Sequence, residues 1–455
     1  MSPIGRFVLF LTLFAAWRLR STLFAEAPPA PGVDSASAIG NASCVALARE
    51  AGIRAKGSTA RNFIISPLSI HAALAKEAAG TRGDTVNELL RFLRSASLNE
   101  LHRAAATELV GRLNGLAQTS FASGVWVDRI IVAMFSVRLE RGTGTRDESR
   151  WLKKIRYNES IHLSNDFFIA RTRFNPPEFT AIAVSRYNAT AESVDFVSGA
   201  EQARQRVNAF VADTTNKHII EVLPPGSVNS STAVVLANAL YFKEAWSQPF
   251  DVSTVPFHIP AGGTTVRVPS MTTSRSQHIA VYPGFRALKL PYKNDVEQQA
   301  EFYMLILLPD RDTVSLADLY DKAVSTPEFI KTHTPTGKVP VGRLMVPKFK
   351  FTSEFEASSD MRKLGITTAF EGGDFSGMMT GGKGLSINGV YHKATIEVDE
   401  VGTVAAAATA VIGLGSAGPG HGVDFVADRP FLFAVVEEGT DAVLLLGQVA
   451  NPLAR

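Results

Sequence analysis

The stretch Glu400-Val-Gly-Thr-Val-Ala-Ala-Ala-Ala-Thr-Ala-Val-Ile-Gly-Leu-Gly-Ser416 decides how the rest of the chain is interpreted. Almost every residue in it is small, and four consecutive alanines are flanked by threonine and valine. No side chain there is large enough to commit the backbone to helix, strand or coil. Loops are normally polar and core elements normally carry large apolar residues, so the segment matches neither pattern. Two interpretations remain: a poorly packed helix with a glycine linker, or a segment that changes its conformation.

Length, charge and cysteine content bound the class of protein. The chain has 455 residues, enough for one large domain with a generous core. Residues 129–171 hold nine Lys/Arg and five Asp/Glu. Removing that stretch from the 46 Lys+Arg and 43 Asp+Glu of the whole chain leaves 37 basic and 38 acidic residues, so the remainder carries no footprint of nucleic-acid binding. Cys44 is the single cysteine, which excludes an intrachain disulfide and a cysteine-based zinc cluster.

The N-terminus has the features of a secretory signal. Arg6 precedes the apolar run Phe7–Trp17, which is too short to span a bilayer, and small residues follow at 25–27. We therefore expect a signal peptide over 1–27 and an extracellular protein, with a cytoplasmic protein as the alternative. Residues 28–40 are rich in Pro, Ala and Ser, which predicts a flexible lead. Sequons for N-glycosylation begin at Asn41, Asn158, Asn188 and Asn229.

Helical patterns dominate the first half of the chain and strand patterns the second. Ser66 is typical of a helix N-cap, Pro67 of a first turn and Gly80 of a stop, which predicts a helix over 67–80. Further helices are expected over 84–92 and 201–210; in the latter, one apolar stripe consists of Ala203, Val207 and Phe210. The strand-forming segments are 233–242, 301–308, 342–351 and 431–447. Helices first and strands later indicate an α+β domain.

Motifs for catalysis and cofactor binding are missing or lack their structural context. Gly413-Leu-Gly-Ser-Ala-Gly418 matches the glycine pattern of dinucleotide sites, but Pro419 and the residues up to Gly422 cannot begin the helix that such a site requires. The sequence has no G-x-S-x-G elbow and no H-E-x-x-H motif, and its nine histidines do not fall at metal-ligand spacing. We expect no catalytic residue, no metal, no cofactor and no enzymatic activity.

Five segments, in order along the chain, resemble the signatures of the serpin family. They are Asn62–Ile70, Leu236–Trp246, Tyr391–Ala394, Asp424–Phe433 and Gly447–Pro452. Leu223–Val228 and Asp424–Asp428 are most similar to plant serpins. The resemblance implies an α+β fold in which helices pack around a large central mixed sheet, with two further sheets and an exposed reactive centre loop. It covers a domain over 41–455, apart from 129–171, which resembles nothing in the family.

The resemblance also implies a function for the segment of small residues that begins at Glu400. In serpins, residues at about 400–423 would be the reactive centre loop: a protease cleaves the loop and becomes acylated, and the loop then enters the main sheet, an established case of strand addition. This implies a monomeric inhibitor of a serine or cysteine protease, consumed in one turnover, with no nucleic-acid partner and no membrane span. The alternative is a non-inhibitory serpin that acts as a binding protein or carries a defective loop.

The residues of the loop hinge suit insertion into a sheet. The alanines at 405–408 add minimal bulk between two packed strands, and Gly402 gives the backbone conformational freedom. Thr403 and Val411 favour a strand once the loop is inserted, and no charge or proline lies between them. The hinge implied by the family comprises Glu400, Val401, Gly402, Thr403, Val404, Ala405, Ala406, Ala407, Ala408 and Thr409.

Two peptide bonds are candidates for the reactive bond. The family's usual spacing from Glu400 places the bond at Ser416-Ala417. Matching Leu414-Gly415-Ser416 to the plant Leu-Arg-Ser motif places it instead at Gly415-Ser416. The basic specificity residue is missing in both alignments, which favours a protease that prefers a small residue.

The resemblance implies one further cluster of residues and does not account for one insert. A sheet-opening cluster would consist of Ser66, Ser69, Asn238, Trp246 and His392. Residues 129–171 form the insert, which has three interpretations: a surface excursion, a heparin-like binding element suggested by its basic bias, or translated non-coding sequence, because structureless loops of this length are uncommon inside compact domains.

Overall fold

A computed structural model describes most of the chain from residue 45 onward. The described residues are 45–50, 52, 61–103, 119–128, 131–136, 163–164, 167–172, 177–242, 244–260, 262–293, 301–311, 313–403 and 422–454. The labelled helices within them are α3 (Pro67–Gly80), α4 (Gly83–Phe92), α5 (Leu98–Arg103), α8 (Pro177–Tyr187), α9 (Phe196–Thr214), α10 (Leu316–Ser325), α11 (Phe329–Thr332) and α12 (Ser358–Lys363), with a short 3-10 turn at Thr368–Phe370. None of the helices in this part of the chain is long and apolar enough to cross a membrane.

The central element is a mixed five-stranded sheet in the order β15-β18-β7-β2-β6. The strands are β15 (Phe349–Glu356), β18 (Ile387–Val398), β7 (Val234–Phe242), β2 (Thr119–Asp128) and β6 (Thr190–Val194). β18 and β7 are parallel neighbours, whereas β15 is antiparallel to β18 and β2 is antiparallel to β7. The long crossover between β7 and β18 contains most of the remaining sheets of the molecule.

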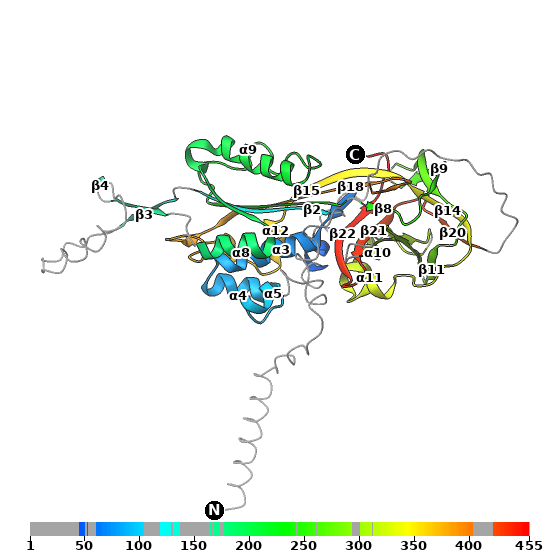
Figure 1. Cartoon of the computed structure of the whole chain (residues 1–455), viewed down its shortest axis with the longest axis horizontal. Coiled ribbons are helices and arrows are strands. Elements are labelled where there is room, and N and C mark those ends of the chain that lie inside the picture. The colour runs from blue at the N-terminus through cyan, green and yellow to red at the C-terminus, as the bar shows by residue number, and fades with distance from the viewer. Residues whose placement is uncertain are drawn as a thin grey trace, which may run out of the picture. The chain divides into compact units, whose positions relative to one another are not determined.

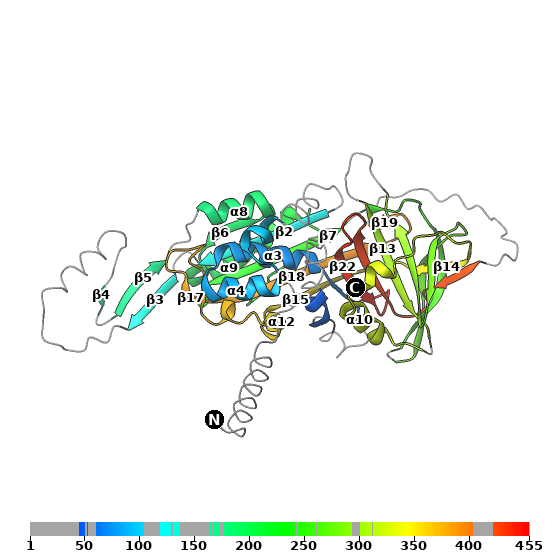
Figure 2. The ribbon, with the colours of Figure 1, turned by 90° about the horizontal axis from the view of Figure 1, so that it is seen from below.

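Helices cover both faces of this sheet, which explains why β7 has an unbroken apolar sequence. All nine residues of β7 are buried. Val234 and Leu236 point into the core that includes α3, whereas Val235 and Ala237 point into the core under α9, because successive side chains of a strand alternate between faces. Figure 1 shows α9 on one side of the sheet and α3 with α8 on the other, and Figure 2 shows the same helices from below.

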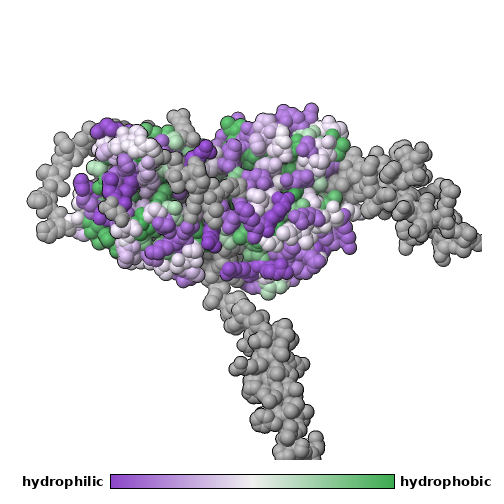
Figure 3. Space-filling model, turned by 180° about the vertical axis from the view of Figure 1, so that it is seen from behind, coloured by the Kyte–Doolittle hydropathy of each residue, from purple (hydrophilic) through white to green (hydrophobic). Residues whose placement is uncertain are grey.

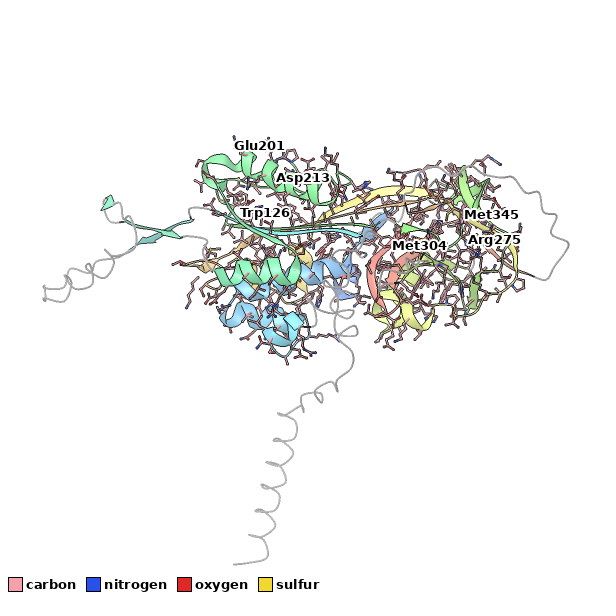
Figure 4. The ribbon with its side chains drawn as sticks, viewed as in Figure 1. Trp126, Glu201, Asp213, Arg275, Met304 and Met345 are labelled. Carbon is pink, nitrogen blue, oxygen red and sulfur yellow. The ribbon has the colours of Figure 1, made fainter. Side chains whose placement is uncertain are left out.

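The α9 side of the sheet is closed by an aromatic contact. Trp126 of β2 lies between the sheet and α9, and its ring meets the edge of Phe210 at a centroid distance of 5.6 Å (Figure 4). Ala203 and Val207 of the predicted stripe are buried in the same core. Glu201 and Asp213, labelled in Figure 4, lie on the exposed side of α9. The amphipathic pattern expected for 201–210 is confirmed, and the helix extends beyond it at both ends.

Two further sheets pack face to face in the second half of the molecule. One has six strands in the order β1-β22-β21-β13-β12-β11, and the other has four in the order β20-β14-β10-β9. Their shared core includes Phe257, Leu288 and Phe425, from three different strands, and Met304, labelled in Figure 4. The strands are β1 (Phe63–Ile65), β22 (Ala442–Val449), β21 (Phe431–Glu437), β13 (Phe302–Pro309), β12 (Phe285–Pro291), β11 (His278–Tyr282), β20 (Val423–Val426), β14 (Val341–Pro347), β10 (Thr264–Thr272) and β9 (Asp251–Ile259).

Three small sheets complete the described structure. Two are β16 (Gly373–Asp374) with β17 (Lys383–Leu385), and β19 (Gly402–Thr403) with β8 (Glu244–Ala245). The third consists of β3 (Ile131–Ser136), β5 (Phe167–Thr172) and β4 (Leu163–Ser164), in which β3 pairs with β5 from Ile131 opposite Thr172 to Ser136 opposite Phe167. These strands belong to the predicted insert, so part of that insert is an antiparallel hairpin.

Two strand-forming segments are each divided in the structure. The segment 342–351 supplies β14 and β15, which belong to different sheets and meet at Lys348. The segment 431–447 supplies β21 and β22, which form an antiparallel hairpin closed by Asp441 at a positive φ of 57°. The α+β class, the large mixed sheet and the two further sheets agree with the expectation from sequence.

Candidate functional site

The site lies along the line between β7 and β18 in the central sheet. The two strands are hydrogen-bonded neighbours from Val234 opposite Ile387 to Tyr241 opposite Thr395. No other strand lies between them over this length, so the sheet is closed there. Beyond Thr395, β18 continues to Val398. β7 ends at Phe242, and the chain that follows it forms β8. The two strands therefore part at this end of the sheet.

The chain reverses direction directly after β18. The Asp399 carboxylate accepts hydrogen bonds from the backbone N–H groups of Val401 (2.9 Å) and Gly402 (3.0 Å), and the Asp399 N–H donates to the Gly402 carbonyl (2.9 Å). Such a carboxylate-capped turn satisfies the backbone donors of Val401 and Gly402 locally. β19 then pairs antiparallel with β8, with Gly402 opposite Ala245 and Thr403 opposite Glu244. The loop thus leaves β18 heading back along the β7–β18 line.

Gly402 is required for space at this crossing. A Cβ atom at Gly402 would lie 2.3 Å from the Glu244 carbonyl oxygen and 2.4 Å from Ala245 Cα. Real Cβ atoms do not approach backbone atoms that closely. The sequence predicted this glycine for its backbone freedom, but the structure gives a different reason, because the close approach to β8 leaves no room for a side chain.

Trp246 anchors the turn from the other side. Its ring stacks on Tyr292 at 4.5 Å with an interplanar angle of 11°, and its indole N–H donates to the Asp399 carbonyl at 2.7 Å. Its backbone N–H donates to the Val401 carbonyl at 2.8 Å. A buried indole that is hydrogen-bonded at its N–H is a rigid support, so Trp246 fixes where the loop leaves the sheet.

An ion pair joins the start of the loop to the junction between β14 and β15. Glu400 is paired with Lys348, and both side chains are about one-third exposed. Burial alone would raise the pKa of the Glu400 carboxyl, but the Lys348 ammonium outweighs it, and the pKa lies below its usual value. The Phe250 N–H also donates to the Glu400 carbonyl at 2.9 Å.

Four polar residues connect β7 and β18 with the N-terminus of α3. Asn238 and His392 are opposite each other in the β7–β18 register, and His392 Nδ1 lies 2.7 Å from Asn238 Oδ1. Asn238 Nδ2 donates to the Ser69 carbonyl at 2.7 Å, and Ser69 Oγ donates to Asn238 Oδ1 at 3.2 Å. The Ser66 N–H donates to His392 Nε2 at 3.1 Å. All four residues are buried.

These contacts assign the protonation state of His392. Because Nε2 accepts from the Ser66 N–H, the ring proton lies on Nδ1 and is donated to Asn238. A second proton would place Nε2–H against a backbone donor. Burial lowers the pKa of His392 to about 3, so the ring is neutral at physiological pH.

Comparison with known proteins identifies the arrangement. The family described as serpin (serine protease inhibitor) matches residues 44–452. The chain belongs to the serpin family.

Plant serpins are similar over most of their length. Serpin-Z12 of Oryza sativa subsp. japonica is 55% identical over 444 residues, covering 94% of each chain. Serpin-ZX of Arabidopsis thaliana is 36% identical, covering 86% of this chain and 92% of its own. Among solved structures, AtSerpin1 of Arabidopsis in its native stressed conformation is 33% identical, has a TM-score of 0.73, and is matched over 93% of this chain and 100% of its own.

Serpins inhibit serine proteases through cleavage and insertion of the reactive centre loop, and the described geometry defines where a serpin loop would enter this sheet. Of the predicted hinge, the structure describes Glu400, Val401, Gly402 and Thr403. The remaining hinge residues 404–409 and the candidate reactive-bond residues Gly415, Ser416 and Ala417 lie outside the described residues.

Of the five predicted cluster members, four lie together under the sheet. Ser66, Ser69, Asn238 and His392 form one hydrogen-bonded group. Trp246 lies at the turn after β18, where it contacts Asp399 and Val401. In this serpin the cluster and the tryptophan are therefore two separate contacts, one beneath the strands and one where the loop begins.

Several residues that hold the turn after β18 and the start of β20 carried no separate signal in the sequence. Lys348 and Asp399 are ordinary surface types by composition, and their partners are distant or backbone groups. At the far end of the loop, Arg343 binds the Asp424 carboxylate through its backbone N–H (2.8 Å) and its guanidinium (2.9 Å and 2.7 Å). These hydrogen bonds hold the pKa of Asp424 below its usual range and fix β20 beside β14.

Proposed function

We propose that this serpin inhibits a protease by offering the reactive centre loop at about 400–423 as bait and then inserting the hinge between β7 and β18. The observation that carries the proposal is the antiparallel pairing of β19 with β8 immediately after β18. A strand that continued in that direction would run antiparallel to both β7 and β18. The sheet would become locally antiparallel, which is the more stable ladder per residue.

The inserted state is also expected to have a lower free energy than the closed sheet, which makes insertion irreversible. Insertion breaks the ladder between β7 and β18 and forms one ladder on each side of the inserted strand, so the net gain is one ladder. At about 1 kcal/mol per hydrogen bond, that gain still favours the inserted state by several kcal/mol. The alanines at 405–408 lose little side-chain entropy and need no cavity. The closed sheet is therefore a metastable state that cleavage of the loop releases.

The protease that we infer prefers a small residue and has a serine or a cysteine nucleophile. Gly415 or Ser416 would occupy the specificity pocket, depending on which bond is cleaved. A trypsin-like pocket gains nothing from either residue, because no basic group is present to pair with it. We propose no enzymatic activity, because neither the loop hinge nor the sheet-opening cluster nor the reactive bond supplies a catalytic group. We also propose that the inhibitor is a monomer.

A direct test is to incubate the full chain with an elastase-class and a papain-class protease and to look for a complex that survives denaturing electrophoresis. N-terminal sequencing of the released fragment distinguishes Gly415-Ser416 from Ser416-Ala417. The matched control is Thr403→Arg, which places a charge where the hinge must enter the sheet. We expect the control to be cleaved without a stable complex. Cleavage of the wild type without a complex would refute inhibition.

A non-inhibitory serpin is the second candidate. It is favoured by Gly415, because glycine offers no side chain to a specificity pocket and an efficient bait normally does. A binding function or a defective loop would then explain an intact serpin fold around an ineffective bait. Substituting Gly415→Arg separates the two: if the fold is competent, the variant gains a stable complex with a trypsin-class protease, and if the fold is defective, it is only cleaved.

We further propose that residues 1–27 are a signal peptide, 28–40 a flexible lead, and 41–455 the serpin domain, with an extracellular location and a cytoplasmic one as the alternative. Asn188 and Asn229, each heading a sequon, are exposed, which supports access by glycosylation enzymes. Expression of the full chain in a plant cell line tests this. A secreted product beginning at residue 28 is expected, and retention of the intact chain in the cytoplasm would contradict it.

A deletion variant tests the role of the basic insert at residues 129–171. Its three interpretations are a surface excursion, a heparin-like binding element and translated non-coding sequence. Deleting 137–162 would leave the described strands β3, β4 and β5 in place. Unchanged heparin affinity and unchanged inhibition would favour the surface excursion, whereas a loss of heparin affinity at low salt would favour the binding element. A transcript without the segment would identify it as non-coding.

A further inference from the structure

Helix α3 carries two ionisable side chains in the interior of the protein, in addition to the sheet-opening cluster. All fourteen residues of α3 are buried. Lys76 and Glu77, near its C-terminal end, are both 0% exposed. Lysine and glutamate are rarely buried to this degree unless each has a partner of opposite charge or a full set of hydrogen bonds.

Lys76 extends the row of polar contacts under the sheet by one strand. Its Nζ donates to Ser123 Oγ of β2 at 3.0 Å. Ser123 is opposite Asn238 in the β2–β7 register, and Asn238 is opposite His392 in the β7–β18 register. Ser69 and Lys76 are seven residues apart, which places them on the same face of α3 two turns apart. The contacts between α3 and the sheet therefore reach β18, β7 and β2.

Both side chains have fewer hydrogen-bond partners than their polar atoms can use. An ammonium has three donors, and the described structure gives that of Lys76 one neutral acceptor. The two carboxylate oxygens of Glu77 are buried with no hydrogen-bond partner. Lys76 and Glu77 are consecutive in the helix and so do not face each other. Burial lowers the pKa of Lys76 to about 8 and raises the pKa of Glu77 to about 7, each opposed by the charge of the other.

We propose that Lys76 and Glu77 destabilise the closed sheet and thereby set how readily it opens to receive the loop, an inference that rests on the proposed function. Insertion requires β7 and β18 to separate by about 4.8 Å, one strand spacing. Because α3 is bonded to all three strands, the sheet cannot part above it without shifting at least one of these contacts. The shift admits water or new backbone partners to polar side chains that the closed state leaves unsatisfied.

Lys76 and Glu77 are thus positioning residues for loop insertion, and neither contacts the protease. The test uses the full chain and a synthetic peptide with the sequence of residues 402–413, whose uptake into the closed sheet is followed by the rise in unfolding temperature. For the double variant Lys76→Met with Glu77→Leu, we expect a higher unfolding midpoint in denaturant and peptide uptake slowed by about tenfold, the factor for one unsatisfied buried polar group. The matched control, Lys322→Met on the exposed side of α10, should change neither.

A second variant separates this effect from a general change in packing. Ser123→Ala removes the acceptor of Lys76, so it should lower the unfolding midpoint and speed peptide uptake in the wild type. In the Lys76→Met background the same substitution should have no such effect. A double variant with an unchanged or lower midpoint, or an equal effect of Ser123→Ala in both backgrounds, would overturn the inference. If the wild type takes up no peptide, the proposed function itself fails and this inference fails with it.

Discussion

At the scale of single residues, Gly402 decides whether the loop can begin its return to the sheet. The backbone of Glu244 occupies the space that any larger residue would need. We predict that Gly402→Ala costs about 1–3 kcal/mol of stability at the hinge, the usual range for forcing a group into a packed site. The variant should be cleaved by the target protease with fewer stable complexes per cleavage.

A matched control exists elsewhere in the same protein. Gly199 lies in the bend of α9, where a Cβ atom would meet its nearest neighbour at 3.4 Å. Gly199→Ala should therefore leave both stability and complex formation nearly unchanged. Equal losses in the two variants would show that the hinge crossing has no special requirement for glycine.

His392 gives a residue-scale prediction for pH. Its pKa in the folded protein is about 3, below the usual histidine value of 6.5, so between these pH values the unfolded chain binds a proton that the folded protein does not bind. Stability should therefore fall as the pH drops below 6.5 and should continue to fall toward 3. His71 and His102, each with a pKa lowered by burial to about 4, contribute in the same direction.

The measurement compares unfolding midpoints in urea at pH 7.5 and pH 5.0. For His392→Gln, the difference between the two midpoints should be smaller than for the wild type, although the variant is less stable at both values. An identical pH dependence in the variant would show that another group carries the effect.

At the scale of elements, the turn after β18 depends on two anchors that lie far apart in the sequence. The Glu400–Lys348 ion pair joins the loop to the β14–β15 junction, and Trp246 joins it to β8. We predict that Glu400→Lys lowers the free energy of unfolding by about 1 kcal/mol, as expected for a pair that is one-third exposed. The exchange Glu400→Lys with Lys348→Glu should restore most of the loss. Failure of the exchange to restore it would place the effect in packing.

Local patterns made some elements predictable from the sequence and left others out of reach. The sequence predicts the helix over 67–80 because its cap, first-turn proline and closing glycine all lie within one short segment of the chain. The pairing of β7 with β18 was beyond residue patterns, because it joins segments about 150 residues apart and is parallel. The division of 342–351 at Lys348 and the contact of Trp246 with Tyr292 are likewise set by tertiary packing.

At the scale of the whole molecule, the surface is ordinary and the unusual features are buried. On the face shown in Figure 3, hydrophilic and hydrophobic residues are interspersed over the described surface, as is usual for a soluble protein. The unusual features lie inside: the parallel pairing of β7 with β18, the row of buried polar contacts under the sheet, and the buried Lys76 and Glu77 of α3. In the account proposed above, these features store free energy in the closed sheet, and cleavage of the loop would release it.

The most direct test of this account is the thermal stability of the protein before and after cleavage of the loop. Limited proteolysis at Gly415-Ser416 or Ser416-Ala417 leaves the two fragments associated, and their unfolding temperature can be compared with that of the intact chain. A new central strand with hydrogen bonds on both sides should raise the unfolding temperature by roughly 20 °C or more. An unfolding temperature that stays the same or falls after cleavage would contradict insertion of the loop between β7 and β18.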